Sequence, residues 1–296
     1  MGVTVFSPAK LNLFLAVTGR RPDGFHDLVS VAAPLDFGDE LEAETGGRGY
    51  ALACDDPAVP VDGSNLVLRA AGAYAVATGW DEPVRFRLTK RIPVGAGLGG
   101  GSSNAVAALR ALNQLAGGRL GEAQLAGLAA ALGSDCALFL AQAPVVMRGR
   151  GERVEPLAPG AAARLRGRRV LVFKPAFGIS TPWAYGRMVA RGTDYLPADQ
   201  AEARLARWLG GEAAAEELLY NNMEPAAFEK YVPLPLLLAK LRAEFGVAVA
   251  MSGSGSACYA LLHEPDTRGD AEVTAMSRRL REWAGAEIFM QEARLA

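Results

Sequence analysis

The feature that most constrains this chain is the glycine-rich segment 93–104, which reads Pro-Val-Gly-Ala-Gly-Leu-Gly-Gly-Gly-Ser-Ser-Asn. Five of its twelve residues are glycines, so its backbone can adopt positive φ angles and a ligand can approach main-chain atoms closely. Ser102, Ser103 and Asn104 are residue types that cap helices, and an apolar helical pattern follows over 105–115. Unpaired amides at the start of such a helix attract anions, and phosphate is the usual one. The sequence therefore predicts a polyphosphate cradle.

Three other interpretations of this segment are weaker. Gly95, Gly97 and Gly100 satisfy G-x-G-x-x-G. A dinucleotide fold, however, needs an apolar strand running into the first glycine and an acidic residue about twenty positions later. A charged, proline-containing stretch, 90–93, precedes the loop here. A Walker A loop ends in Gly-Lys-Ser/Thr, and no lysine stands there. A glycine-rich turn without a ligand would lose much conformational entropy on folding, and no ligand binding would offset that loss.

Composition limits the class of protein. A chain of 296 residues predicts two domains, and a formal net charge of −1 does not suggest a nucleic-acid partner. No apolar run reaches the length of a membrane span, so no membrane partner is expected. Cys54, Cys136 and Cys258 are too far apart for a metal site or a disulfide framework. This pattern fits a reducing compartment, so a cytoplasmic protein is expected.

Two charged residues stand in apolar surroundings. Residues 3–17 look like two strands broken at Pro8, in which Lys10 and Asn12 fall on the same face. Lys10 is either an edge residue that reaches water or a functional cation, and the pattern leaves both open. Asp135 follows a helical pattern that ends near Leu132, where an aspartate is commonly a helix cap. Capping and a functional role both stay open for it.

The rest of the chain mixes strands and helices. Phe25 stands beside His26, one of only two histidines, and the pair could bind a planar ligand or simply be solvated. Helical patterns recur in the second half, and a strand runs into the small-residue loop 252–256. Strands and helices without a regular βαβ alternation predict an α+β fold in each half. The expected second-half helices cover about 199–209, 212–220 and 233–244, after a linker over 156–169.

Three segments, in this order, resemble the motifs of the GHMP small-molecule kinases: Pro-Ala-Lys-Leu-Asn-Leu at 8–13, the loop 93–104, and Met-Ser-Gly-Ser-Gly-Ser-Ala at 251–257. Together with Arg-Pro-Asp-Gly-Phe-His at 21–26, they are most similar to the branch that acts on a CDP-linked branched tetritol. The resemblance spans nearly the whole chain. It implies a two-domain α+β GHMP kinase fold, with a ribosomal S5 domain 2-like domain over 1–155, a ferredoxin-like domain over 156–296, and the site in the cleft between them.

The resemblance also implies an activity. Such enzymes transfer the γ-phosphoryl group of ATP to a hydroxyl of the CDP-linked tetritol, in the non-mevalonate route to isoprenoids. Asp135 matches the catalytic base and Lys10 the lysine beside it, which favours the functional interpretation of both residues. Phosphoryl transfer needs mainly alignment and charge neutralisation, which such a pair can supply. Mg²⁺ is expected on the phosphates, held chiefly by the nucleotide and water, since no carboxylate cage is visible in the sequence.

The remaining site residues follow from the same motifs. Asn12 is expected to bind the tetritol, His26 to read the cytosine edge, and Phe25 and Tyr185 to supply stacking faces, while Thr181 lies in a matching Thr-Pro segment. The family usually has tyrosine where this chain has Phe25, so the ring is kept without its hydroxyl. The expected ATP-binding residues are Asn65, Leu66 and Lys90 near adenine and ribose, and Pro93, Val94, Gly95, Ala96, Gly97, Leu98, Gly99, Gly100, Gly101, Ser102 and Ser103 around the phosphates.

Two other functions are compatible with the glycine loop. Homoserine and mevalonate-type kinases share the glycine loop but have no reason to keep an aromatic–histidine pair for cytosine. A non-catalytic nucleotide sensor needs no base, so Lys10 together with Asp135 argues against it.

Overall fold

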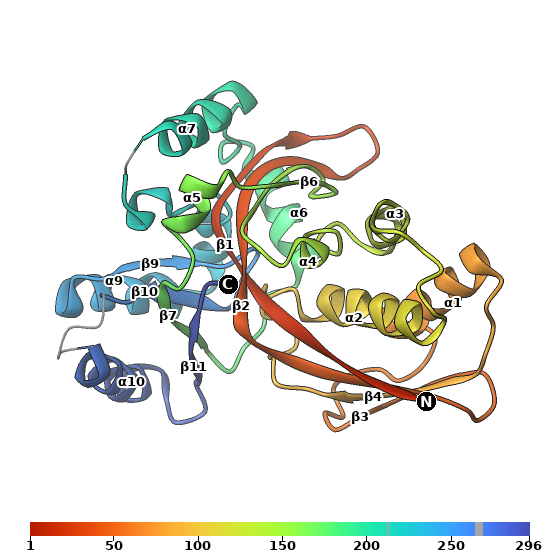
Figure 1. Ribbon diagram of the computed structural model, residues 1–296. Helices are drawn as coiled ribbons and strands as arrows, with labels where there is room; N and C mark the ends of the chain where they lie inside the picture. The colour runs from red at the N-terminus through yellow and green to blue at the C-terminus, as the bar shows by residue number, and fades with distance from the viewer. Residues whose placement is uncertain (212, 264–268) are drawn as a thin grey trace.

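The computed structural model describes residues 1–211, 213–263 and 269–296, and within them the strands form two sheets (Figure 1). The seven-stranded sheet has the order β3-β4-β2-β1-β8, and β5 and β6 extend it from β2. The four-stranded sheet has the order β11-β7-β10-β9. Strands β3 and β4 are parallel and α1 connects them, but most of the other neighbouring strands are antiparallel and no regular βαβ alternation follows. The predicted α+β class is therefore confirmed.

The strands of the first sheet come mostly from the first half of the chain: β1 (Gly2–Arg20), β2 (His26–Thr45), β3 (Tyr50–Cys54), β4 (Val84–Thr89), β5 (Val145–Gly149), β6 (Arg153–Pro156) and β8 (Tyr220–Asn221). The second sheet uses the second half: β7 (Arg169–Lys174), β9 (Ala248–Met251), β10 (Cys258–Leu261) and β11 (Phe289–Arg294).

The helices divide in the same way. The first half contains α1 (Leu66–Thr78), α2 (Gly100–Leu115), α3 (Glu122–Leu132) and α4 (Leu138–Ala141). The second half contains α5 (Pro159–Ala163), α6 (Thr181–Arg191), α7 (Ala198–Gly210), the 3₁₀ helix η1 (Ala215–Leu218), α8 (Glu224–Lys230), α9 (Pro233–Phe245) and α10 (Gly269–Ala284).

The first strand runs unbroken through Pro8, so the predicted break there is wrong. It pairs antiparallel with β2 along almost its whole length, and the register shifts between Pro8 and Lys10 and again between Asn12 and Phe14. Pro8 lies opposite Gly38, where a Cβ atom would stand 2.3 Å from the carbonyl oxygen of Ser7. The glycine therefore gives the two strands room to pair across the proline.

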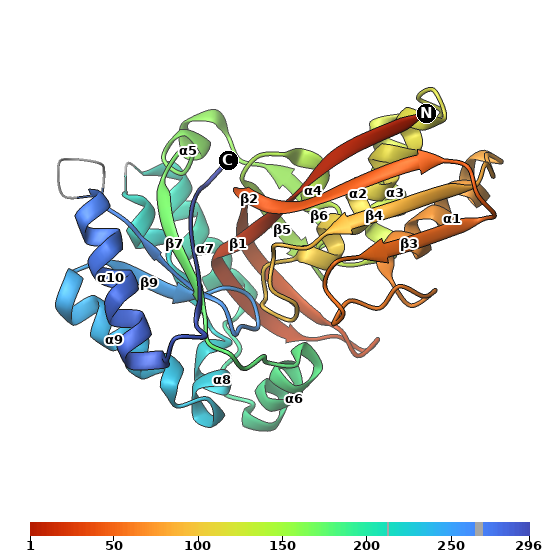
Figure 2. The same ribbon diagram turned by 90° about the horizontal axis from the view of Figure 1, so that it is seen from below.

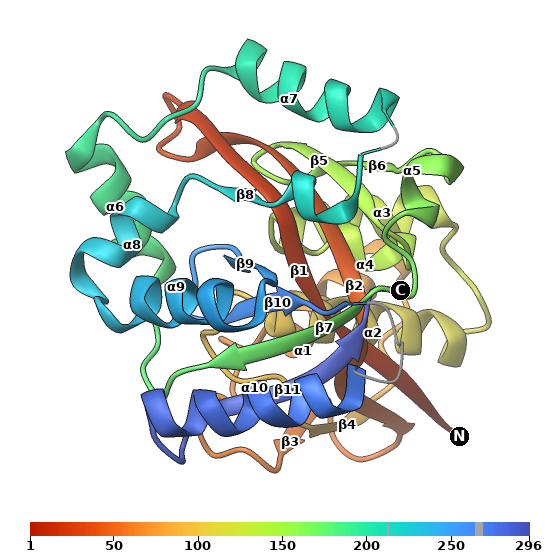
Figure 3. The same ribbon diagram turned by 90° about the vertical axis from the view of Figure 1, so that its left-hand side faces the viewer.

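Buried side chains lie on both faces of the long β1–β2 ribbon. One face packs with α1, α2 and α3 (Figure 2). On the other face, Leu11 and Leu13 pack with Val170 and Val172 of β7. The alternate β7 residues, Leu171 and Phe173, point to the other side of the strand. They belong to the buried cluster that includes residues of α1, α2 and α3, and this cluster also contains residues of α9 and α10. Figure 3 shows these two helices along the outer face of the four-stranded sheet.

Two expectations for the second half need correction. The helix expected over 212–220 is wrong where the structure describes it, because η1 is a single short turn and β8 then pairs parallel with Phe14 and Leu15. Residue 212 lies outside the described residues. The expected linker contains the short helix α5.

Candidate active site

A cavity of about 1040 Å³ lies where β1, the glycine loop, α6 and the loop after β9 meet. Its wall includes every residue predicted for the site except Ser103. Such a volume is at the upper end of the usual range for a ligand site, which suits an enzyme with two substrates. The structure thus brings the predicted set together, and the role of each residue stays a prediction.

Lys10 and Asp135 lie at the centre of this cavity. The Lys10 side chain is only 3% exposed, and its Nζ lies 3.5 Å from Oδ2 of Asp135 and donates a hydrogen bond to Oδ1 of Asn12. The Asn12 amide in turn donates to Oγ of Ser30 at 3.0 Å. Lys10 is therefore no edge residue, because β1 turns it and Asn12 away from the apolar face that carries Leu11.

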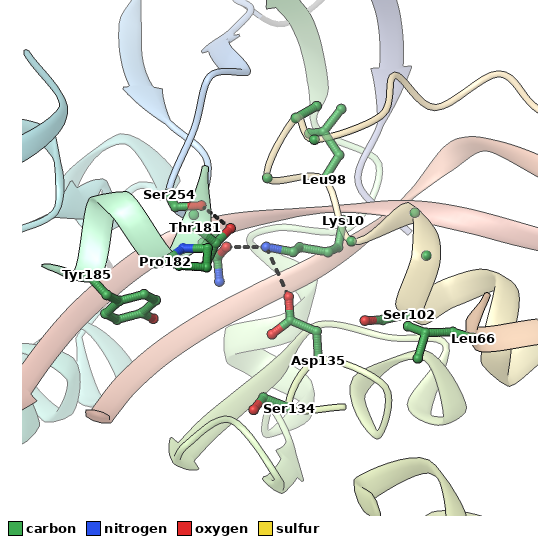
Figure 4. Close-up of a pocket in the computed structure, with 18 of the residues that line it drawn as sticks. Lys10, Leu66, Leu98, Ser102, Ser134, Asp135, Thr181, Pro182, Tyr185 and Ser254 are labelled. Atoms are coloured by element: carbon green, nitrogen blue, oxygen red, sulfur yellow. Dashed lines mark hydrogen bonds and ion pairs between the residues drawn. The ribbon is translucent and has the colours of Figure 1, made fainter. Parts of the chain in front are cut away.

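Asp135 does not cap a helix. The preceding helix α3 ends at Leu132 with Gly133 as its C-cap, and the Asp135 side chain is 36% exposed and lies in the cavity wall. Figure 4 shows its carboxylate facing Lys10, with Tyr185 on one side and Ser102 and Leu66 on the other. The pair therefore stands between two ends of the cavity that differ in their chemistry.

The glycine loop ends at the first turn of α2. Gly99 is the N-cap with φ 73°, and a Cβ atom there would lie 2.8 Å from Phe139 and 3.0 Å from Lys10. Ser103 donates the first helical hydrogen bond, to Gly99, so the amides of Gly100, Gly101 and Ser102 have no partner within the helix. These three amides form the positive end of a sixteen-residue helix.

The prediction that Ser102, Ser103 and Asn104 begin this helix is wrong, because Gly99 can adopt the left-handed conformation that starts it earlier. Ser103 and Asn104 are buried instead. The hydroxyl of Ser103 accepts a hydrogen bond from Ser7 at 2.8 Å, which explains why Ser103 does not line the cavity.

Residues 252–257 donate hydrogen bonds to main-chain carbonyls of the glycine loop. The hydroxyl of Ser252 donates to the carbonyl of Gly97 at 3.1 Å, and the amide of Ala257 donates to the carbonyl of Ala96 at 3.0 Å. Gly97 has φ 78°, and a Cβ atom there would lie 2.4 Å from the carbonyl oxygen of Ser252. The two small-residue loops therefore form one continuous wall.

Aromatic side chains occupy one end of the cavity. The rings of His26 and Tyr185 stack with centroids 4.6 Å apart, and Nε2 of His26 lies 3.1 Å from the hydroxyl of Tyr195. Burial, and secondly the charge of Arg20, lowers the pKa of His26 below its ordinary value of 6.5. Burial raises the pKa of Tyr185, with a smaller contribution from the charge of Asp135. At neutral pH this end therefore presents a neutral imidazole and a neutral phenol.

Phe25, by contrast, does not stack with His26. It is 50% exposed, and the guanidinium carbon of Arg150 lies 4.6 Å from its ring centre. Thr181 shares a hydrogen bond of 2.9 Å with Ser254. Both Phe25 and Thr181 line the cavity from opposite halves of the chain.

The opposite end is built around the start of α1. Asn65 is its N-cap, accepting from the amide of Val67 at 2.9 Å, and Leu66 follows. Lys90 is 6% exposed, and its Nζ is bound by Oδ2 of Asp39 at 2.6 Å. All three predicted residues line the cavity, although the side chain of Asn65 is already engaged in capping.

Several lining residues were not predicted: Ser30, Val59, Pro60 and Arg150. No local pattern distinguishes them, since Ser30 reads as one polar residue in an apolar strand and Arg150 as one of several charges in 148–153. Among the described residues, no three His, Cys, Asp or Glu side chains are grouped as metal ligands. None of the helices in the described part of the chain has the length and apolar character needed to cross a membrane.

Comparison with known proteins identifies the family of this chain. The model of the GHMP kinases N terminal domain matches residues 65–143, and that of the GHMP kinases C terminal matches residues 201–282. The chain is 38% identical to 4-diphosphocytidyl-2-C-methyl-D-erythritol kinase of Synechococcus sp. (strain CC9902), covering 95% of this chain and 96% of that one. It is 36% identical to the enzyme of that name from Methylacidiphilum infernorum (isolate V4), covering 90% and 88%.

A solved structure supports the same family. The crystal structure of a 4-(cytidine 5'-diphospho)-2C-methyl-D-erythritol kinase superposes with a TM-score of 0.76 at 35% identity, over 99% of this chain and all of that chain. Both halves of the fold and both small-residue loops lie within this alignment of nearly the full length. The chain therefore belongs to the GHMP kinases, in the family of the 4-diphosphocytidyl-2-C-methyl-D-erythritol kinases.

Proposed function

We propose that this protein is the ATP-dependent kinase that phosphorylates the 2-hydroxyl of 4-diphosphocytidyl-2-C-methyl-D-erythritol, in the non-mevalonate route to isoprenoid precursors. The observation that carries the proposal is the pair of Lys10 and Asp135, 3.5 Å apart, between an anion-binding helix start and an aromatic pocket. Relatives with that name support the substrate.

The chemistry follows from this placement. The ATP phosphates lie on the amides of Gly100, Gly101 and Ser102, which direct the γ-phosphoryl group toward the centre of the cavity. The substrate hydroxyl oxygen attacks the γ-phosphorus, and its proton passes to the Asp135 carboxylate. The bond between the γ-phosphorus and the bridging oxygen breaks, and its electron pair stays on that oxygen of the departing ADP. Lys10 stabilises the negative charge on the attacking oxygen, and its hydrogen bond to Asn12 holds it there.

The residues also fit a magnesium ion bound mainly by the nucleotide. One carboxylate, Asp135, and one hydroxyl, Ser102, lie in the wall near the start of α2. Mg²⁺ in kinase sites is usually held by one or two protein groups, phosphate oxygens and water. When bound, it would neutralise charge on the phosphates.

The boundary between the domains, near residues 155 and 156, is part of the proposal. The change from one sheet to the other falls between β6 and β7, which supports it, although β8 returns to the first sheet. We further propose a cytoplasmic location, because Cys54, Cys136 and Cys258 are all free thiols.

Substrate choice separates this proposal from its competitors. Homoserine and mevalonate carry no nucleobase that could occupy the end of the cavity at His26 and Tyr185. The cytosine of the CDP-linked substrate offers this end a ring face and a hydrogen-bonding edge. We expect ADP release with the CDP-linked substrate to exceed that with homoserine or mevalonate by at least about a hundredfold, because the site binds a group those compounds lack. Faster turnover of homoserine or mevalonate would contradict the proposal, and nucleotide binding without turnover of any of the three would favour a sensor.

Replacement of His26 by alanine is expected to act on one substrate only. It removes the stacked ring and its hydrogen bonds, so KM for the CDP-linked substrate should rise about 10- to 100-fold. KM for ATP should change less than about threefold, because ATP binds at the opposite end of the cavity from His26. Steady-state kinetics with each substrate varied separately would measure this. Tyr195→Phe is the matched control, since it removes only the hydroxyl bonded to Nε2, and equal changes in both KM values would contradict the assignment.

The lowered pKa of His26 predicts a pH dependence. The neutral ring offers one donor and one acceptor, and protonation below pH 6.5 removes the acceptor and places a second cation near Arg20. KM for the CDP-linked substrate, measured at saturating ATP, should therefore rise as pH falls through this lowered pKa, and the rise should be absent in His26→Ala. Because the unfolded chain binds the proton more tightly, the His26 contribution to stability also falls as the pH drops below 6.5. A KM that decreases on acidification would overturn the assignment.

A further inference from the structure

A buried carboxylate outside the reaction centre joins the two ends of the glycine loop. Asp39 on β2 is completely buried and accepts four hydrogen bonds. The donors are Nζ of Lys90 at 2.6 Å, the amides of Arg91 and Ile92 at 2.7 and 2.8 Å, and Nδ2 of Asn104 at 2.9 Å. Residues 90–92 lead into the loop, and Asn104 lies on the helix that follows it.

The network continues behind the helix. Asn104 also donates to the hydroxyl of Ser7 at 2.8 Å, and that hydroxyl donates to Ser103. The first strand, the second strand, the entry to the loop and the first turns of α2 are thus tied together through one buried charge. An uncompensated carboxylate at full burial would be very unfavourable, so these donors determine one arrangement of the segments around it.

The charged partner of Asp39, the ammonium of Lys90, lies at the edge of the nucleotide site. Lys90 lines the cavity, and a Cβ atom on Gly100 would stand only 3.0 Å from its Nζ. The ammonium is therefore held beside the first residue of α2, next to the free amides. Without Asp39, this cation would lose its place among the buried groups and the loop would lose its anchor.

We propose that Asp39 is a positioning residue for nucleotide binding, acting through Lys90 and through the loop entry. It touches neither substrate, and it sets the spacing between the loop and the start of α2 on which the phosphates depend. This inference rests on the proposed function only in taking ATP as the nucleotide.

Asp39→Asn is the informative substitution. The side-chain oxygen of asparagine can still accept from the two amides, but its NH₂ group faces the donors Lys90 and Asn104. We expect the Kd for ADP, measured by titration calorimetry, to rise about 10- to 100-fold, as for a lost charge-assisted hydrogen bond. At saturating ATP, kcat and KM for the second substrate should stay within about threefold of the parent values.

A double-variant cycle distinguishes positioning from a general loss of stability. In a Lys90→Gln background, Asp39→Asn should change the Kd for ADP by less than about threefold, because the link it removes is already broken. Asn113→Ala is the matched control: Asn113 makes partly buried hydrogen bonds at the far end of the same helix, and its loss should lower Tm without changing the Kd. Equal effects of Asp39→Asn in both backgrounds would overturn the inference.

Other outcomes are also decisive. If Asp39→Asn does not fold, Asn104→Ala tests the network from the helix side, with a Kd for ADP about tenfold higher expected. Parent-like ADP binding by folded Asp39→Asn, or by folded Asn104→Ala, would refute the inference and leave the proposed function intact. Failure of the parent protein to bind ADP would instead refute the proposed function.

Discussion

Replacement of Asp135 by asparagine is expected to lower kcat by about two to four orders of magnitude, the usual contribution of a general base. Asparagine has nearly the same shape, but it cannot accept the hydroxyl proton and it places a neutral amide 3.5 Å from the Lys10 ammonium. In the proposed complex the nucleotide phosphates contact the glycine loop and not this carboxylate, so binding of ADP should be retained.

The measurement is ADP release at saturating concentrations of both substrates, with the Kd for ADP determined on the same preparation. Asp27→Asn is the matched control, because it removes an equal charge, one paired with Arg21 at 3.0 Å, without altering the surroundings of Lys10. Its kcat should remain within about threefold of the parent value. Unchanged turnover in Asp135→Asn would remove this residue from the chemical step.

Replacement of Gly97 by alanine is expected to lower kcat/KM by at least about a hundredfold, the effect of displacing a reacting group by about an ångström. The added Cβ atom would lie 2.4 Å from the carbonyl oxygen of Ser252, so one of the two loops must move. The left-handed backbone, with φ 78°, adds a further cost of about 1–2 kcal/mol for a residue other than glycine.

Gly95→Ala separates the two causes. Gly95 also has a left-handed backbone, with φ 64°, but nothing lies within 4 Å of the position of its Cβ atom. It should therefore lose about 1–2 kcal/mol of stability with less than about a tenfold change in kcat/KM. Thermal melts and steady-state kinetics on both variants would provide the comparison. Equal activity of Gly97→Ala and Gly95→Ala would show that the contact with Ser252 does not matter to catalysis.

The centre of the site could be predicted because its signals are local. Two-residue alternation placed Lys10 and Asn12 on one face of β1, and the structure confirms that they share the cavity. The density of glycine predicted positive φ angles in the loop, and Gly95, Gly97 and Gly99 adopt them, while the close approach of a ligand stays a prediction. The α+β class followed from the absence of a regular βαβ alternation.

What the sequence did not reveal depends on contacts between distant segments. Asp39 is one charged residue in a strand pattern, and its buried hydrogen bonds come from residues 90–92 and Asn104, more than fifty positions away along the chain. The start of α2 was placed too late because propensity favours serine caps, whereas a glycine in the left-handed conformation begins the helix here. Pro8 suggested a break because its partner Gly38 is thirty residues away.

The wall formed by the two small-residue loops has a consequence for unfolding. Ser252 bonds to Gly97 and also accepts from the amide of Asn12, so the four-stranded sheet and the long ribbon meet at the reaction centre itself. We therefore expect heat that loosens the second half of the chain to open the cavity at the same temperature, and substitutions that weaken the buried packing of α9 to lower activity as well as stability.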